Sequence, residues 1–180
     1  MMKQKKEIPD HDVKEVATFL NRLLADEYVL YTKTRNTHWN VDGSNFFELH
    51  VFLENQYNAL DVMIDDIAEQ IHSLGHFAIG SLKNFLIALN TSEENYDYSN
   101  SGQIIQTLIN DHETIFRTIR NEIHLLSDKH TGTGIAEFAI GLMKQHEKMA
   151  RNLKIFMPKP EFRKTKHIHA INKQSISLQA

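Results

Sequence analysis

The 180-residue sequence contains no cysteine, only seven glycines and three prolines, and no apolar run of the roughly 18 residues that a membrane helix needs. The lack of cysteine excludes disulfides and thiolate metal sites. Because Pro9, Pro158 and Pro160 all lie near the ends, the middle of the chain is free to form long helices. The basic start leads into an amphipathic segment rather than an apolar signal core, so a cytoplasmic location is expected.

Charge is distributed unevenly along the chain. The formal total is −3, the first twelve residues are neutral, and the segment from Pro158 onward carries plus four, so the body between them carries −7. An acidic body with one basic tail fits a protein that handles cations at least as well as one that binds nucleic acid.

Apolar residues recur at three- and four-residue spacing in four long stretches, which predicts four helices. Asp12 is expected to cap the first helix and Gly75 to end the second. The expected ranges are 12–38, 45–74, 102–127 and 135–156, with a short apolar piece at 81–89 in the long second connection. This pattern predicts an all-α, ferritin-like antiparallel four-helix bundle with one crossover and a short extra helix. We expect one domain over residues 13–157, flanked by tails 1–12 and 158–180.

The segment 37–75 is rich in side chains that bind metals through nitrogen or carboxylate oxygen: His38, His50, Glu54, Asp65 and Glu69. His38 and His50 flank the first turn and are expected to meet there. Asp65, however, lies roughly 22 Å from His50 along one continuous helix at 1.5 Å rise per residue, so the two cannot share an ion within one chain.

A second, antiparallel copy of the helix that crosses near Tyr57 and Asn58 would place His50 of one chain beside Asp65 of the other. Two-fold pairing is the commonest symmetry of oligomers, and it predicts a metal site shared between chains and present twice per pair. Nitrogen and oxygen donors without sulfur suit iron(II) or another intermediate divalent ion. The plain alternative remains that the histidines are polar surface groups and the acids a solvated face.

A di-iron centre inside one bundle is a rival within the same fold. It requires a Glu-x-x-His motif on each of two helices. Glu69 and His72 supply one such motif, but Met143 stands three residues before His146, so the fourth helix lacks the second. An intrachain centre is therefore disfavoured. A metal-free interaction scaffold would leave the two-fold complementarity unexplained.

The joint pattern of these residues resembles the Dps family, the miniferritins or DNA-binding proteins from starved cells. The likeness covers residues 13–156 and rests on these motifs: His38-Trp39-Asn40-Val41, Gly43, Phe46, Leu49-His50, Glu54, Tyr57, Asp65, Ala68-Glu69, Ile71, Leu74-Gly75, Asp111-His112-Glu113 and His146-Glu147-Lys148. Gln70 and Arg151 depart from the family pattern, where arginine and tryptophan are frequent. Neither is an expected ligand.

The resemblance implies a hollow shell of twelve subunits that oxidises iron(II), preferably with hydrogen peroxide rather than oxygen, and stores the ferric mineral inside. It implies His38 and His50 of one chain with Asp65 and Glu69 of its partner as the catalytic metal ligands, assisted by Glu54. Trp39 would shield the site or intercept stray oxidising equivalents, unless it simply packs at an interface. Asp128 and Glu137 are candidates for an iron-entry pore, with plain surface charge as the alternative.

DNA compaction is the alternative function, since some relatives bind duplexes through basic tails in a salt-sensitive manner. The candidate contacts are Lys3, Lys5, Lys6, Arg163, Lys164, Lys166 and Lys173. Acids near the N-terminal lysines and the acidic body argue against it, whereas repetition of a plus-four tail over many subunits argues for it.

Overall fold

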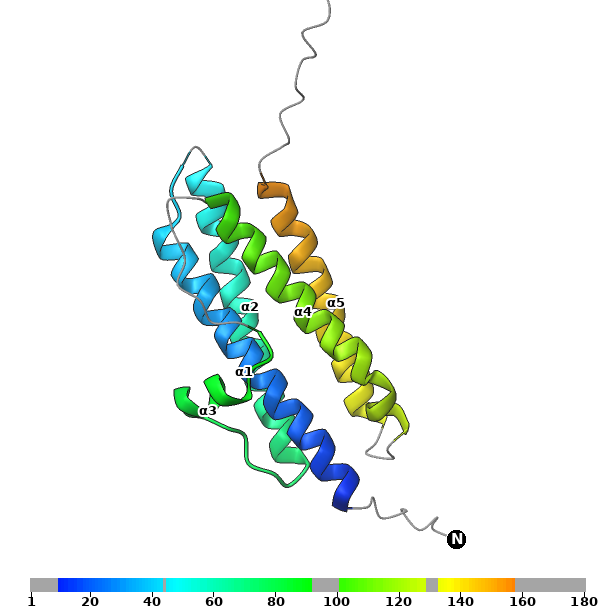
Figure 1. The fold of residues 1–180 in the computed structure, drawn as a ribbon. Coiled ribbons are helices and arrows are strands. Elements are labelled where there is room, and N and C mark those ends of the chain that lie inside the picture. Colours follow the sequence, from blue (N-terminus) through cyan, green and yellow to red (C-terminus); the bar gives the residue numbers. More distant parts are fainter. Residues whose placement is uncertain (1–9, 44, 92–100, 129–132, 158–180) are drawn as a thin grey trace, which may run out of the picture.

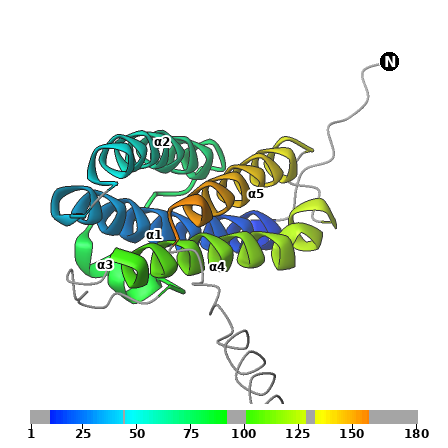
Figure 2. The same cartoon turned by 90° about the horizontal axis from the view of Figure 1, so that it is seen from above.

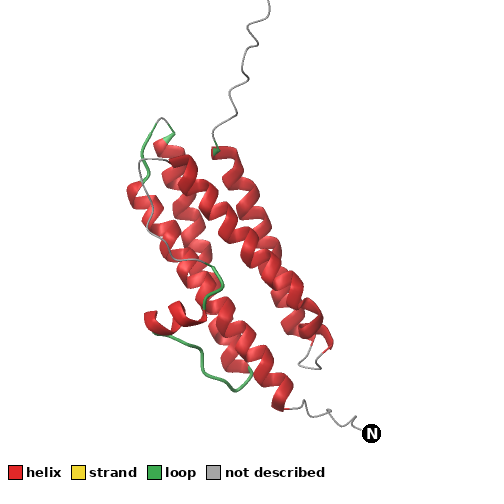
Figure 3. Ribbon diagram, viewed as in Figure 1, coloured by secondary structure: helices red, strands yellow, loops and turns green. Residues whose placement is uncertain are grey.

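The computed structural model describes residues 10–43, 45–91, 101–128 and 133–157, and all regular structure within these ranges is helical (Figure 3). The elements are α1 (Asp10–Asn40), α2 (Phe46–Ser73), α3 (Leu82–Ala88), α4 (Ser101–Asp128) and α5 (Thr133–Leu153), followed by a 3₁₀ turn, η1 (Lys154–Phe156). The predicted all-α class and the short extra helix are confirmed.

Two antiparallel helix pairs form the bundle, α1 with α2 and α4 with α5, packed lengthwise against each other (Figures 1 and 2). The end of α2 and the start of α4 lie at opposite ends of the bundle, so the connection between them crosses its full length (Figure 1). The short helix α3 belongs to this connection and packs on the outside of α1. This is the predicted four-helix arrangement with one crossover.

The core consists of aliphatic and aromatic side chains that repeat every three or four residues along each long helix. In α1 the fully buried stripe includes Val16, Phe19, Leu20 and Leu23, and in α2 it includes Leu53, Leu60, Ile67 and Ile71. Burial of each such side chain stabilises the fold by about 1.5–3 kcal/mol. The amphipathic period is therefore what aligns the four helices.

Glycine ends α2 as predicted. Gly75 has a φ of +78°, a left-handed conformation that glycine adopts without a steric penalty. Its N–H donates to the carbonyl of His72, and the N–H of His76 donates to the carbonyl of Ile71. This pair of bonds is a Schellman motif, which satisfies carbonyls left free at the helix end.

Two predicted boundaries differ from the structure. The helix α1 begins at Asp10, so Asp12 lies within its first turn and is not the cap. The last helix tightens to a 3₁₀ turn at Lys154, where the chain approaches the proline at 158 that cannot continue a helix. No helix within the described ranges is long and apolar enough to cross a bilayer.

Candidate metal centre

The turn between α1 and α2 brings His38 and His50 face to face. Val41 is buried beneath this turn, and Gly43, with a φ of +120°, reverses the chain within a few residues. The two imidazole rings stack with their centroids 3.7 Å apart and an interplanar angle of 25°. The predicted meeting of the two histidines is therefore seen within one chain.

Reciprocal hydrogen bonds fix the tautomer of both rings. His38 Nδ1 donates to the carbonyl oxygen of His50, and His50 Nδ1 donates to the carbonyl oxygen of His38, each at 3.0 Å. A carbonyl oxygen only accepts, so the proton of each neutral ring must sit on Nδ1. The lone pair of each Nε2 is then free to bind a metal, and backbone support of this kind is typical of histidine ligands.

Aromatic side chains hold the histidine pair in place. Tyr57 meets the His38 ring edge-on at 5.3 Å between centroids, and Phe46 stacks on His50 at 5.0 Å. His38 is almost completely buried and His50 is half-buried. The pair is thus a rigid donor set with limited access to solvent.

The predicted carboxylate ligands lie elsewhere on α2. Asp65 and Glu69 are both exposed, and Asp65 sits about 22 Å along the helix from His50 at 1.5 Å rise per residue. Glu54 is also exposed, one turn beyond His50. Among the described residues of this single chain, no three His, Asp or Glu side chains come close enough to hold an ion. One chain therefore assembles the imidazoles but not the acids.

The other predicted residues have the following positions. Trp39 is 66% exposed, and the guanidinium of Arg35 lies 5.6 Å from its ring and 5.2 Å from that of Tyr57. Glu137 is exposed on α5, and α4 ends at Asp128. The basic tail residues proposed for DNA contact lie outside the described ranges.

A second titratable cluster lies inside the bundle, and the sequence alone does not bring its members together. His112 of α4 and His146 of α5 place their Nδ1 atoms 3.0 Å apart, and His146 Nε2 lies 2.6 Å from Oε1 of Glu27 on α1. All three side chains are 0% exposed. The signal that sequence offered was Glu27 itself, an acidic residue within the apolar stripe of α1 between Leu24 and Leu30.

Burial, and next the charge of His146, lowers the pKa of His112 well below its usual value of 6.5. His112 is therefore neutral at physiological pH. The two histidines and Glu27 do not form a complete metal site, because His146 already uses both ring nitrogens in the contacts described above.

Comparison with known proteins supports the family that this geometry indicates. A family profile described as a ferritin-like domain matches residues 17–159. A low temperature-induced protein of Nostoc, itself uncharacterised, is 35% identical over 150 residues, which cover 83% of this chain and 84% of that relative. DNA protection during starvation protein 2 of Bacillus anthracis is 28% identical over 144 residues, covering 80% and 97% of the two chains.

Solved structures give the same result. The Dps protein of Vibrio cholerae, described as a member of a superfamily of ferritin-like diiron-carboxylate proteins, aligns with a TM-score of 0.77 and 26% identity, covering 86% of this chain and 96% of that chain. Dps from Staphylococcus aureus aligns with a TM-score of 0.75 and 29% identity, covering 81% and 97%.

Proposed function

Because this chain belongs to the Dps family of the ferritin-like superfamily, which supports a general role in iron storage and in protection from oxidative stress, we propose that it is a ferroxidase. It oxidises iron(II), with hydrogen peroxide as the preferred oxidant, and stores the ferric product inside a homododecameric shell. The active site is completed by two subunits related by a two-fold axis. His38 and His50 come from one chain, and Asp65, Glu69 and the assisting Glu54 complete the set.

The observation that carries this proposal is the half-built site. Two imidazoles stand fixed with free Nε2 lone pairs, and Glu54 lies one turn from His50 on the same helix. The other two carboxylates of the motif, Asp65 and Glu69, lie more than 20 Å away at 1.5 Å rise per residue. Intermediate divalent ions favour mixed nitrogen and oxygen ligands. A second chain is the simplest source of the missing acids.

The surface of α2 supports pairing of this kind. At about 100° per residue, the exposed apolar side chains Phe47, Val51 and Val62 share one stripe of the helix with Asp65 and Glu69. Helix α3, which packs on the outside of α1, carries further exposed apolar side chains: Leu82, Leu86 and Ile87. An apolar stripe that also carries the acids is suited to pack against an antiparallel copy of itself.

The ligand chemistry fits oxidation of iron. Each of two iron(II) ions gives one electron to a hydrogen peroxide molecule, which takes up two protons and leaves as two waters. Carboxylates stabilise the resulting iron(III) because both are hard and oppositely charged. The two histidines, whose Nδ1–H groups donate to backbone carbonyls, keep the metal positions defined while the oxidation state changes. Trp39, which follows His38 in the chain and is exposed, would shield the site or intercept stray oxidising equivalents.

Subunit complementation tests the shared site directly. His50→Ala and Asp65→Ala should each abolish rapid iron(II) oxidation when assembled alone. Chains mixed in equal amounts, unfolded and reassembled should regain about one quarter of the wild-type rate, because half of the random pairs contain one intact site of two. Oxidation is followed by absorbance of the ferric product under peroxide and under air.

The control is Asp66→Ala, which removes an exposed acid next to Asp65 without touching the proposed ligands. It should keep the wild-type rate. If the mixed assembly stays inactive although both variants fold and co-assemble, the site does not span two chains. If both single variants oxidise iron at the wild-type rate, the ligand assignment is wrong.

DNA binding through the basic segment after Pro158 is the second candidate, and it rests on the plus-four charge of that segment. Electrostatic contacts of this type weaken as salt displaces counterions. A gel shift with duplex DNA should therefore weaken with salt and vanish when residues 161–180 are deleted. A shift that survives the deletion would assign any DNA contact to another part of the chain.

A further inference from the structure

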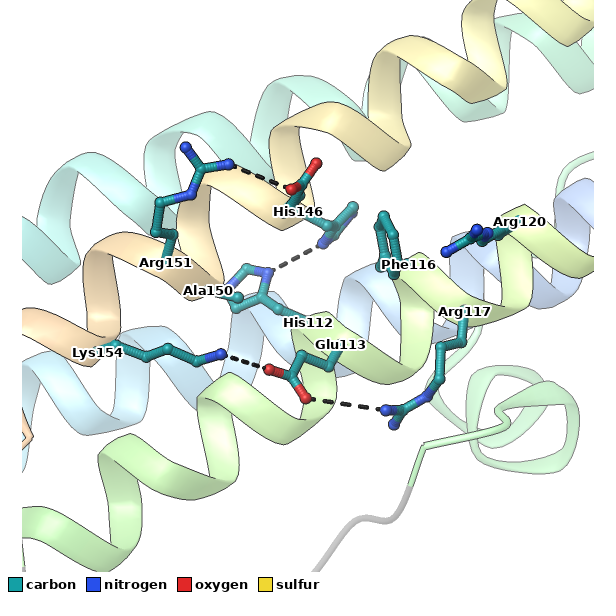
Figure 4. A pocket seen from close by; sticks show the side chains of 10 residues that line it. His112, Glu113, Phe116, Arg117, Arg120, His146, Ala150, Arg151 and Lys154 are labelled. Carbon is teal, nitrogen blue, oxygen red and sulfur yellow. Dashed lines mark hydrogen bonds and ion pairs between the residues drawn. The ribbon is translucent and has the colours of Figure 1, made fainter.

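A pocket of about 440 Å³ opens between α4 and α5, close to η1 (Figure 4). It shares no residue with the proposed metal centre, which lies on α1 and α2. Four cationic side chains and two carboxylates line it, giving a formal charge of plus two: Arg117, Arg120, Arg151, Lys154, Glu113 and Glu147. A concave site with excess positive charge attracts anions.

These six charged side chains form the rim of the pocket, and the two glutamates neutralise only part of its positive charge. Glu113 accepts from Lys154 at 2.8 Å and lies 3.8 Å from Arg117, while Glu147 accepts from Arg151 at 3.2 Å. Arg120 forms no ion pair within the described part of the chain. Ion pairs as exposed as these contribute little free energy, so the cations are available to a ligand of higher charge. Guanidinium groups in particular match the geometry of oxoanions.

Below this rim, the rings of His112 and His146 lie between the two helices (Figure 4). Together with Glu27 they form a continuous chain of hydrogen bonds from the pocket to the bundle core. At each end of this chain of hydrogen bonds, one fully buried atom has no hydrogen-bond partner among the described residues: His112 Nε2 at one end and Glu27 Oε2 at the other. Unpartnered buried polar atoms are costly and call for an explanation.

The chain of hydrogen bonds admits two proton arrangements. When Glu27 is a carboxylate, His146 donates to it from Nε2 and accepts at Nδ1 from His112, whose Nε2 is then a bare lone pair. With one more proton, His146 donates from Nδ1 to His112, and His112 carries its own proton on Nε2. The added proton is then held between His146 Nε2 and Glu27, either as an ion pair or as a protonated carboxyl group. One proton taken up at His112 is thus passed through His112 to the His146–Glu27 pair.

Because the pKa of His112 is lowered, this residue passes a proton on rather than holding it as a buried imidazolium next to His146. A proton that arrives at Nε2 must therefore leave from Nδ1. The other charged groups near the cluster are the six rim side chains and Asp111, which is paired with Lys33 at 2.8 Å. Within this cluster, Glu27 is the remaining carboxyl group that can take the proton.

We propose that this pocket binds a small oxoanion, and that binding draws one proton into the Glu27–His146–His112 chain so that His112 donates from Nε2 to the anion. The rim arginines and Lys154 supply the charge, and the buried chain supplies a hydrogen bond without creating a second buried cation. The inference is independent of the metal centre on α1 and α2.

Calorimetric titration with sulfate tests both parts of the proposal. Sulfate does not titrate near neutral pH, so any heat that depends on the ionisation enthalpy of the buffer reports protonation of the protein. The full chain should bind sulfate with uptake of about one proton per anion, and Arg120→Gln should weaken binding about tenfold or more. Lys144→Gln is the matched control, since Lys144 is an exposed cation of α5 that does not line the pocket, and it should leave binding unchanged.

Two further variants isolate the proton step. Glu27→Gln should still bind sulfate but without proton uptake, because the amide accepts from His146 and takes no proton. His112→Gln offers an amide N–H directly and should likewise bind without uptake, which decides the question if the first variant fails to fold. Circular dichroism and gel filtration verify fold and assembly.

The proposal is overturned if the wild type shows no binding up to about 10 mM sulfate. An equal loss in Lys144→Gln and Arg120→Gln would also overturn it, since the effect would then be one of net charge alone. Proton uptake that persists in both Glu27→Gln and His112→Gln would remove the relay.

Discussion

Lys33 and Asp111 form a buried ion pair that joins α1 to α4, with Nζ 2.8 Å from Oδ2 and both side chains less than one tenth exposed. Removing two charges from water is expensive, and their attraction offsets that cost only while both partners are present. The pair therefore sets how the two helix hairpins register against each other more than it adds net stability. It differs in this respect from the exposed pairs of Glu113 and Glu147, which contribute little.

Breaking this pair on one side should be severe. Lys33→Met leaves Asp111 charged and buried, and we expect a loss of about 3–5 kcal/mol in the free energy of unfolding, measured by guanidinium denaturation. The double variant Lys33→Met/Asp111→Leu removes both charges and should recover most of that loss. A single-variant loss below about 1 kcal/mol would show that the carboxylate finds another partner or solvent.

At the scale of whole elements, the helices could be predicted because their signals are local. The three- and four-residue period reports which face of a helix is buried, and Gly75 reports where α2 must stop. The meeting of His38 and His50 was also predictable, because the turn that separates α1 from α2 is short enough to fix their register. The predicted start of α1 lies two residues after the observed one, because aspartate favours the first turn of a helix as well as the cap.

The contacts between distant helices could not be predicted in the same way. Glu27 and His146 are 119 residues apart, and their contact depends on how α1 and α5 are rotated about their axes. Side-chain periodicity fixes the buried face of each helix to within about one residue step of 100°, which does not select a partner on another helix. Glu27, a charged residue inside the apolar stripe of α1, indicates a buried polar contact, but it does not identify the partner residue.

At the scale of the whole molecule, one face of α2 carries exposed apolar side chains that do not pack within the bundle. On α2 the exposed apolar stripe and the proposed acidic ligands coincide, whereas the opposite face is buried in the core. Assembly and catalysis should therefore depend on the same surface. A substitution that blocks pairing should abolish oxidation even though every proposed ligand remains in place.

Val62→Glu makes this prediction specific. Val62 is 61% exposed on the stripe that carries Asp65, and an antiparallel copy crossing near residues 57 and 58 would place the new charge close to Glu54 of the other chain. Repulsion and the burial of an unpaired charge oppose pairing, so light scattering should show that the variant forms particles of lower mass than the wild-type assembly. The iron(II) oxidation rate should fall about tenfold or more while helix content is unchanged.

Ile155→Glu, which makes the same kind of exchange at a 76% exposed residue of η1, should keep both assembly and rate. Wild-type assembly and rate in Val62→Glu would mean that α2 is not the pairing surface, and the acids that complete the histidine pair would then have to come from elsewhere.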